Sequence, residues 1–369
     1  MHTHSQLIFL ELLRSGLWDT ELDLSLFKGD VDWKAVADIA KKQTVTGIVM
    51  DGIAKLPQEL RPNKAIYFNL IYIVRQIEED NSRANKVIPI IMNELRSKGC
   101  DSLLQKGQGV AMNYRIPYHR QAGDVDLLVG FDEDAYRKAC ALMEGMSAHV
   151  GHNDRKRRHA EFSVRDVPVE IHGNVDSFIN RRCDARITAW AKKRVDGDKL
   201  IFHSRFGDIK LPPFNFDAIY IFVHMAGHYM GGGVGLRQVS DWMMYLNRNY
   251  DRIDMEMLKS DIEWLGIGRY WGLFAAMAVK YLGLPVGKMP FYDAAYERKC
   301  GRLLSHIFLT GNFGALQKEK QLKGGSNNVL KKMVTFVGQV PVYLHNLLVF
   351  PGDTMYRFMK FVKIGLKDV

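Results

Sequence analysis

Apolar residues recur every three or four positions through the first 97 residues, and this spacing predicts helices. The strongest example covers residues 63–98, where an apolar face that includes Leu70 and Ile77 continues along the whole segment. The pattern favours one long helix there, and Pro89 is expected to kink that helix or to split it in two. We therefore predict an N-terminal helical region over residues 1–97.

The periodicity changes near residue 100, where segments become shorter, glycines appear and apolar residues alternate with polar ones. Such alternation is typical of β-strands. The predicted strands cover residues 101–106, 125–129, 160–164 and 167–172, and a helix is predicted over residues 134–144. These elements indicate an α+β fold, with a small mixed sheet and its helices over residues 98–212.

Helical spacing returns from about residue 214 and predicts a C-terminal helical domain over residues 213–324. A Gly/Ser/Asn-rich link at 324–328 separates it from a tail over residues 325–369. The tail is basic and amphipathic, and Pro351 is expected to break it into two short helices. It could contact an anionic membrane or a partner, or its apolar face could pack on the core.

Composition narrows the class of protein. The chain has 369 residues, of which 47% are hydrophobic, so a disordered protein and a disulfide-dependent fold are both excluded as the main state. Its four cysteines show no CxxC spacing, and no apolar run reaches the roughly 18–20 residues that span a bilayer. These features predict a cytoplasmic location. The net charge of +10 favours a polyanionic partner such as a nucleotide, a nucleic acid or a membrane.

The sharpest chemical signal is a pair of carboxylates in the predicted strand 125–129. Asp124 and Asp126 are two positions apart, so they point to the same side of a strand. Their mutual repulsion is relieved by a divalent cation, and such cations suit phosphoryl chemistry. Glu170 on a later strand can supply a third carboxylate, with Glu161 and Asp166 as weaker choices. Two solvated aspartates at a strand end are the alternative.

Phosphate-binding groups are expected on both sides of that strand. Lys106, Gly107 and Gly109 join a predicted strand to a helix, and glycines there let backbone N–H groups approach a phosphate. A plain turn is the alternative. Arg120 could clamp a phosphate through two hydrogen bonds or lie in a solvated loop.

These motifs together resemble a known family. The segments LLQKGQGVAMNYRIPYHRQAGDVDLLV, VEIH and HMAGH…GLRQVSDW look like the uncharacterised bacterial nucleotidyltransferases, within the DNA polymerase beta-like nucleotidyltransferase superfamily. The resemblance covers roughly residues 45–250. It implies that Asp124 and Asp126 are ligands of both metals, and that Glu170 holds the catalytic metal and helps to deprotonate the acceptor.

The same resemblance implies that Gly107 and Gly109 lie against the triphosphate, and it favours a phosphate-binding role for Arg120. The superfamily usually has Gly-Ser or Gly-Gly where this chain has Gly107-Gln108, and the gap to the aspartates is longer here. This departure bears on how the triphosphate is held.

Three histidines lie near these motifs. His172 shares a strand face with Glu170, so it could position a ligand or carry a proton, and a buried structural histidine is the alternative. His224 and His228 have the i, i+4 spacing of zinc ligands, but no HExxH motif or thiol accompanies them. A polar wall facing the substrate is therefore the preferred interpretation.

Two charged features have an ordinary structural interpretation. Arg237 and Asp241 are four residues apart on a predicted helix, which favours a simple salt bridge between them. The basic run 155–158 is expected on a solvated face, although its position allows contact with a triphosphate or an acceptor.

The sequence therefore predicts a metal-dependent nucleotidyltransferase. It would use Mg²⁺ or Mn²⁺ to transfer NMP from an NTP to an unidentified acceptor hydroxyl or phosphate, releasing pyrophosphate. The acceptor could be a small molecule, a sugar phosphate or a protein; a nucleic acid is not expected, and the tail could touch a membrane. Two alternatives are a kinase-like phosphotransferase on the same fold and a catalytically degenerate nucleotide-binding module.

Overall fold

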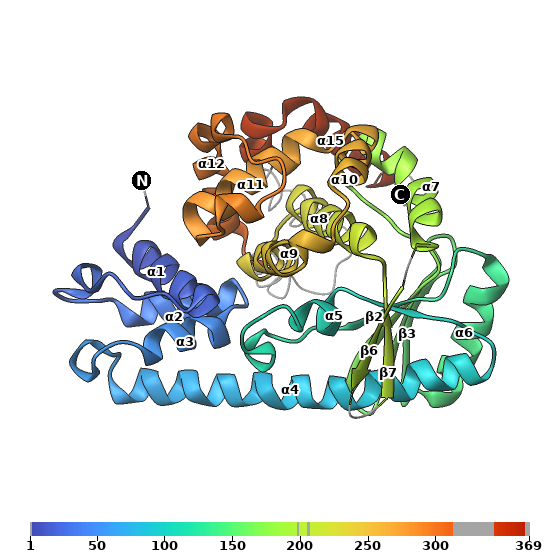
Figure 1. Cartoon of the computed structure of the whole chain (residues 1–369), viewed down its shortest axis with the longest axis horizontal. Helices are drawn as coiled ribbons and strands as arrows, with labels where there is room; N and C mark the ends of the chain where they lie inside the picture. Colours follow the sequence, from blue (N-terminus) through green and yellow to red (C-terminus); the bar gives the residue numbers. More distant parts are fainter. Residues whose placement is uncertain (1, 198, 205–206, 313–342, 366–369) are drawn as a thin grey trace.

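A computed structural model describes residues 2–197, 199–204, 207–312 and 343–365 of the chain. Its longest element is α4 (Lys64–Ser97), which runs along one side of the molecule from the N-terminal helices to the sheet (Figure 1). The preceding helices α1 (His4–Trp18), α2 (Trp33–Lys42) and α3 (Thr46–Ala54) pack together at one end of α4. The helical N-terminal region is therefore confirmed.

The long helix predicted around Pro89 is also confirmed, but the proline does not split it. α4 continues through Pro89 for a total of 34 residues. Pro89 is buried and lies beside Gly207 of the second sheet. This packing offsets the helical hydrogen bond that a proline cannot donate.

The main sheet has five strands in the order β1-β2-β5-β4-β3. β2 and β5 run parallel, and the other neighbouring strands are antiparallel, so the predicted mixed sheet is confirmed. The bounds are β1 (Leu103–Gln105), β2 (Val125–Leu128), β3 (His149–Asp154), β4 (His159–Val164) and β5 (Val167–His172). The predicted helix between β2 and β3 is α6 (Glu133–Met146), which packs on β4 and β5.

Four elements were not predicted: β3, the helix α7 (Arg181–Val195), and the hairpin of β6 (Leu200–Ser204) and β7 (Gly207–Leu211). The residues of β3 are almost all exposed. An exposed strand with polar residues on both faces lacks the apolar alternation from which a strand is predicted.

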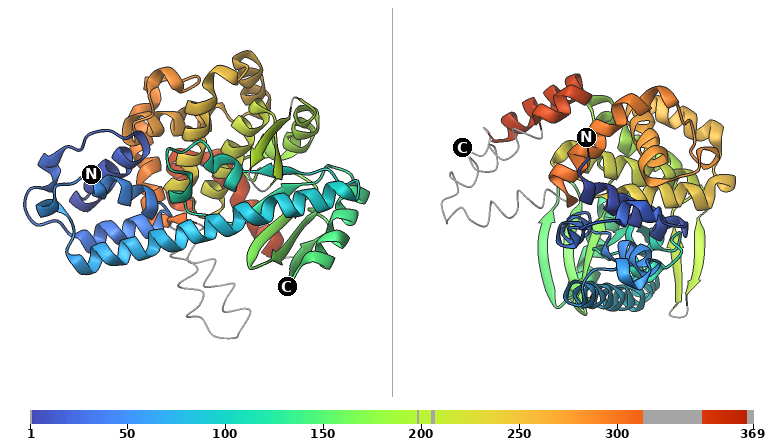
Figure 2. Two further views of the ribbon diagram at one scale, coloured as in Figure 1. Left: turned by 60° about the horizontal axis from the view of Figure 1, so that its bottom comes forward. Right: turned by 90° about the vertical axis from the view of Figure 1, so that its left-hand side faces the viewer.

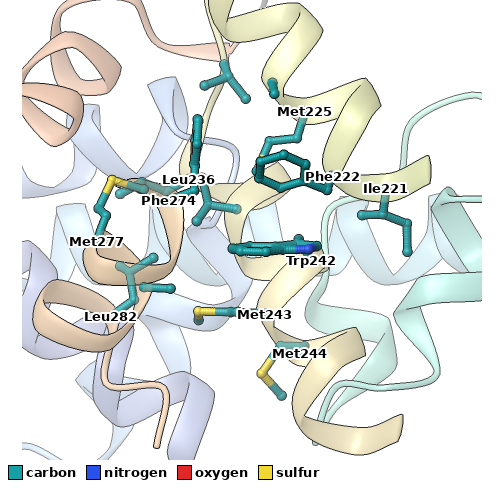
Figure 3. Packing of buried hydrophobic residues seen from close by; sticks show 14 of the residues in the cluster. Ile221, Phe222, Met225, Leu236, Trp242, Met243, Met244, Phe274, Met277 and Leu282 are labelled. Atoms are coloured by element: carbon teal, nitrogen blue, oxygen red, sulfur yellow. The ribbon is translucent and has the colours of Figure 1, made fainter. Parts of the chain in front are cut away.

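The C-terminal helices form a second layer above α4 and the sheet (Figures 1 and 2). They are α8 (Phe214–Gly231), α9 (Leu236–Asn249), α10 (Met255–Leu265), α11 (Gly268–Leu282) and α12 (Glu297–Thr310). Figure 3 shows their packing: Phe222 of α8 and Trp242 of α9 face Phe274 and Met277 of α11. The helical character predicted for this region is confirmed.

Two hydrophobic cores hold these layers together. The first joins α1, α2 and α3 with α8, α9, α10, α11 and α12, and the second joins the main sheet with α6 and the last turns of α4. α4 contributes to both, with Leu70 in the first core and Ile88 in the second. The boundaries predicted at 97/98, 212/213 and 324/325 remain predictions.

Part of the basic tail packs against the C-terminal helices. Residues 343–349 are helical, and α15 (Pro351–Gly365) begins after Phe350, so the break expected at Pro351 is confirmed. The Phe350 ring stacks on Tyr270 with 3.9 Å between ring centroids. The link 324–328 and residues 325–342 lie outside the described residues.

Two further predictions concerned the state of the cysteines and the presence of membrane-spanning segments. All four cysteines are free and buried, as their spacing predicted. No helix in the described ranges combines the length and the apolar character needed to cross a membrane.

Candidate active site

Two cavities adjoin where the carboxyl end of β5 and the start of β2 face the helices α8 and α9. Their volumes are about 180 Å³ and 530 Å³. Four residues line both of them: Lys106, Glu170, His224 and His228. Asp124 and Asp126 line the smaller cavity, together with arginines from two segments. A molecule in either cavity would therefore lie beside the same charged groups.

The three predicted carboxylates come together at this place. Asp126 is in β2, Asp124 directly precedes that strand, and Glu170 is in the parallel neighbour β5. The register pairs Asp126 with Glu170, which brings their side chains to one side of the sheet. Oxygen atoms of all three carboxylates lie within 4.8 Å of one another.

Their environments give the three carboxylates different charge states. Repulsion from Asp126 raises the pKa of Asp124 to about 7. Burial alone would raise the pKa values of Asp126 and Glu170, but neighbouring cationic groups hold both below their ordinary values. Near pH 7, Asp126 and Glu170 are therefore ionised, and Asp124 is partly protonated. Mg²⁺ and Mn²⁺ bind carboxylate oxygens, and the negative charge of these three carboxylates is compensated only in part. The three residues therefore fit a divalent cation.

Lys106 supplies a fixed positive charge at the boundary between the cavities. Its Nζ lies 2.9 Å from Asp126 Oδ1 and 3.4 Å from the His224 ring nitrogens. Burial would lower the pKa of Lys106, but Asp126 raises it above the ordinary value, so the side chain stays protonated. The backbone φ of +50° is rare for a residue other than glycine, and such strain is concentrated at functional sites.

The glycine turn lies only partly at the cavity. Gly107 lines the smaller cavity, and a Cβ there would come within 3.3 Å of the Asp124 carbonyl oxygen. Gly109 is not among the residues that line either cavity, because its Cα faces Leu211 and Leu104. Gln108 donates to Asn85 of α4, 2.9 Å away.

Arg120 lines the smaller cavity but is already engaged with a carboxylate. Its Nε and Nη2 donate to the two oxygens of Asp241 at 2.7 and 2.8 Å, and both side chains are buried. Tyr114 Oη donates a third hydrogen bond to Asp241, at 2.7 Å. Arg120 was expected to bind a phosphate through two hydrogen bonds. In this structure it makes the two bonds to the carboxylate of Asp241 instead.

The prediction of a salt bridge between Arg237 and Asp241 is therefore wrong. Arg237 instead donates to the backbone oxygen of Gln121 at 3.1 Å, and it forms no ion pair with any described residue. Burial lowers the pKa of Arg237. Its guanidinium lies beside Gly123 in the smaller cavity, where it can meet an anion.

Two histidines from neighbouring strands connect the carboxylates. His172 Nε2 lies 2.9 Å from Asp126 Oδ1 and 3.3 Å from Glu170 Oε2, so this predicted residue is at the site. Burial would lower the pKa of His172, but its hydrogen bond to Asp126 raises it. His159 Nε2 lies 3.0 Å from Glu170 Oε2. His159 was not predicted as a site residue, because its place opposite His172 depends on the pairing of β4 with β5.

His224 and His228 form a wall common to both cavities. Their Nε2 atoms are 3.0 Å apart. Burial lowers the pKa of His228 to about 4 and holds the pKa of His224 well below its ordinary value, so both rings are neutral near pH 7. Neither belongs to a group of potential metal ligands found among the described residues.

Four other residues near the motifs or the cavities complete the description of the site. His119 hydrogen-bonds Asp51 at 2.7 Å, outside both cavities. Arg157 of the basic run lines the larger cavity. Tyr220 and Arg357 also line it, but they come from distant helices and no local pattern marks them.

A carboxylate cluster on two neighbouring strands of a mixed sheet, bordered by cationic groups, is typical of proteins that act on phosphates through a divalent cation. Comparison with protein families agrees with this class. The model of a family described as uncharacterised nucleotidyltransferase matches residues 29–283, more than half of the chain, and the chain belongs to this family. No curated protein and no solved structure matches the chain.

Proposed function

We propose that this nucleotidyltransferase is a metal-dependent enzyme of the DNA polymerase beta-like superfamily. It transfers NMP from an NTP to an acceptor hydroxyl or phosphate and releases pyrophosphate. The observation that supports this proposal most strongly is the cluster of Asp124, Asp126 and Glu170, whose negative charge is compensated only in part. Such a cluster fits a reaction in which charge develops on phosphate oxygens.

Asp124, Asp126 and Glu170 would hold Mg²⁺ or Mn²⁺. A cation held there would neutralise charge on the phosphate oxygens and polarise the α-phosphorus. Glu170 stays ionised, because His159 and His172 hold its pKa below the ordinary range. We therefore assign Glu170 to orienting the acceptor hydroxyl, whose proton passes to solvent as the new O–P bond forms.

The triphosphate would occupy the smaller cavity. Lys106 and Arg237 present positive charge there, and Gly107 leaves room for a phosphate close to the backbone. Arg120, held by Asp241, adds charge at the same wall. Pyrophosphate then leaves on the side of Lys106 and Arg237. The rate enhancement comes mainly from positioning and from fixed charges, since no side chain needs to form a covalent intermediate.

The direct test measures transfer to candidate acceptors. The four NTPs are incubated with Mg²⁺ or Mn²⁺ and with sugar phosphates, alcohols, protein and RNA, and mass spectrometry detects the label. Asp124→Asn and Asp126→Asn should each reduce transfer at least about 100-fold. Loss of a group that only supports a metal ligand already costs about 10–100-fold, and loss of the ligand itself should cost more. Asp251→Asn, an exposed aspartate far from the cavities, is the control. Unchanged transfer in folded Asp124→Asn and Asp126→Asn proteins would overturn the mechanism.

Two other functions remain distinguishable by their products. Release of NDP instead of pyrophosphate would show a kinase-like phosphotransferase. A degenerate nucleotide-binding module is favoured by the positions of Gln108 and Gly109, which do not face the smaller cavity. Calorimetry with Mg-NTP separates that module from an enzyme, because it would show binding without turnover.

The cytoplasmic location and contact of the tail with an anionic membrane remain predictions. The buried free cysteines agree with a reducing compartment.

A further inference from the structure

The larger cavity has room for a second substrate beside the proposed triphosphate site. Its volume of about 530 Å³ falls in the range of small-molecule sites. Glu170 and Lys106 form part of its wall and part of the wall of the smaller cavity. A molecule bound there would therefore lie beside the carboxylate cluster and next to the smaller cavity.

Two arginines from distant parts of the chain meet in this cavity. Arg157 lies in the turn between β3 and β4, and Arg357 lies in α15. Both guanidinium groups lie over the ring of Phe178, at 5.1 and 5.6 Å from its centroid. Both arginines and Phe178 line the larger cavity, so a molecule bound there has two guanidinium groups in its wall.

Between them, the two arginines make one ion pair with a described residue, and it is long. Arg157 lies 3.7 Å from Asp154, and both side chains are partly exposed. Burial lowers the pKa of Arg357, and the nearby carboxylate of Asp184 offsets part of that effect. Asp176 also lines the cavity, so the two arginines supply its cationic side, and guanidinium groups are well suited to bind a phosphate.

The backbone around the arginines is strained in a way that is concentrated at binding sites. Phe178 has a φ of +57°, which is rare for a bulky side chain. Gly232 and Gly233, which also line the cavity, have φ of +133° and +158° and carry no side chain that would fill it. The fold therefore keeps this space open and places Phe178 under the two charges.

We propose that the larger cavity is the acceptor site and that it selects a small acceptor carrying a phosphate group. Arg157 and Arg357 bind that group, and a hydroxyl of the same molecule points to Glu170. This inference rests on the proposed nucleotidyl transfer: the hydroxyl oxygen bonds to the α-phosphorus, the bond from that phosphorus to the pyrophosphate oxygen breaks with its electrons, and the hydroxyl proton goes to solvent. It also makes α15 part of the site.

Arginine modification tests the binding site directly on the full-length protein. Phenylglyoxal reacts with arginine side chains, and mass spectrometry of peptides reports the extent at each position. Inorganic phosphate and glucose 6-phosphate should slow modification of Arg157 and Arg357 at least about threefold, whereas glucose should not. Arg298 on α12 is exposed and outside the cavity, so it should react equally in all samples. Equal modification of Arg157 and Arg357 with and without phosphate would overturn the proposal.

Calorimetry separates this proposal from the proposed function. Arg157→Gln and Arg357→Gln should weaken glucose 6-phosphate binding about 10-fold or more, since each removes a charged hydrogen-bond donor, and Arg298→Gln should not. Mg-NTP binding should remain unchanged in all three variants. If Mg-NTP neither binds nor reacts while the arginine effects hold, the proposed function fails. If transfer occurs but the acceptor affinity is the same in all variants, the acceptor site is wrong.

Discussion

Two clusters of charged side chains lie beside the smaller cavity, and they differ in how fully their charges are paired. In the first, Arg120 and Asp241 match one charge with one opposite charge through two hydrogen bonds, and Tyr114 adds a third. In the second, three carboxylates share Lys106 and the histidines His159 and His172.

The difference shows what each cluster can do. A matched and hydrogen-bonded pair carries little net charge, so its main effect is to hold the segment before β2 against α9. The unmatched cluster has no counter-charge left for Asp124, so repulsion from Asp126 raises the pKa of Asp124 to about 7, and a bound cation would relieve that repulsion. Carboxylates beside cationic side chains therefore stabilise the fold in the first cluster and form a candidate cation site in the second.

The largest expected effect concerns the balanced pair. Asp241→Asn leaves the buried Arg120 without its counter-charge, and it should reduce the free energy of unfolding by about 3–5 kcal/mol. Urea denaturation followed by circular dichroism measures this. Asp251→Asn is the control, and an unchanged midpoint for Asp241→Asn would show that the pair does not stabilise the fold.

A smaller effect should distinguish the two clusters by their response to Mg²⁺. At a concentration ten times its Kd, Mg²⁺ should stabilise the wild type by about 1.4 kcal/mol, because it binds the folded state. The combined Asp124→Asn/Asp126→Asn variant should lose this increment. Asp241→Asn should keep it, relative to its own lower baseline. Equal stabilisation of all three proteins in thermal melts would place cation binding elsewhere.

The smallest effect is a pH-dependent gain in stability for Asp124→Asn without metal. Folding raises the pKa of Asp124 to about 7, so the native state disfavours its carboxylate, and the penalty grows as pH rises from about 4 to 7. In EDTA, Asp124→Asn should melt at the same temperature as wild type near pH 4 and a few degrees higher above pH 7. Solvent screening at this exposed residue keeps the gain small. A gain that is larger at pH 4 would contradict the assigned pKa.

The sequence predicted the parts of this site that depend on local pattern. Alternation along one strand placed Asp124 and Asp126 on the same side, and the apolar neighbours of Glu170 marked a second buried strand. The mixed sheet and the long helix were predictable for the same reason. Their periodicity is a property of neighbouring residues.

The parts that were missed depend on contacts between distant residues. The expected Arg237–Asp241 pair would contribute only about 0.3–0.5 kcal/mol on a helix surface, and the buried bidentate contact with Arg120 replaces it. Arg357 reaches the larger cavity from α15, far from any other proposed site residue in sequence. No spacing rule could associate it with Arg157.

The long helix α4 has a mechanical consequence. Its 34 residues extend about 50 Å, and they are anchored in both hydrophobic cores. Near its middle, Asn81 donates to the backbone oxygens of Tyr118 and Arg120, each at 2.8 Å. α4 therefore ties the segment that leads into β2, and with it Arg120, to both hydrophobic cores.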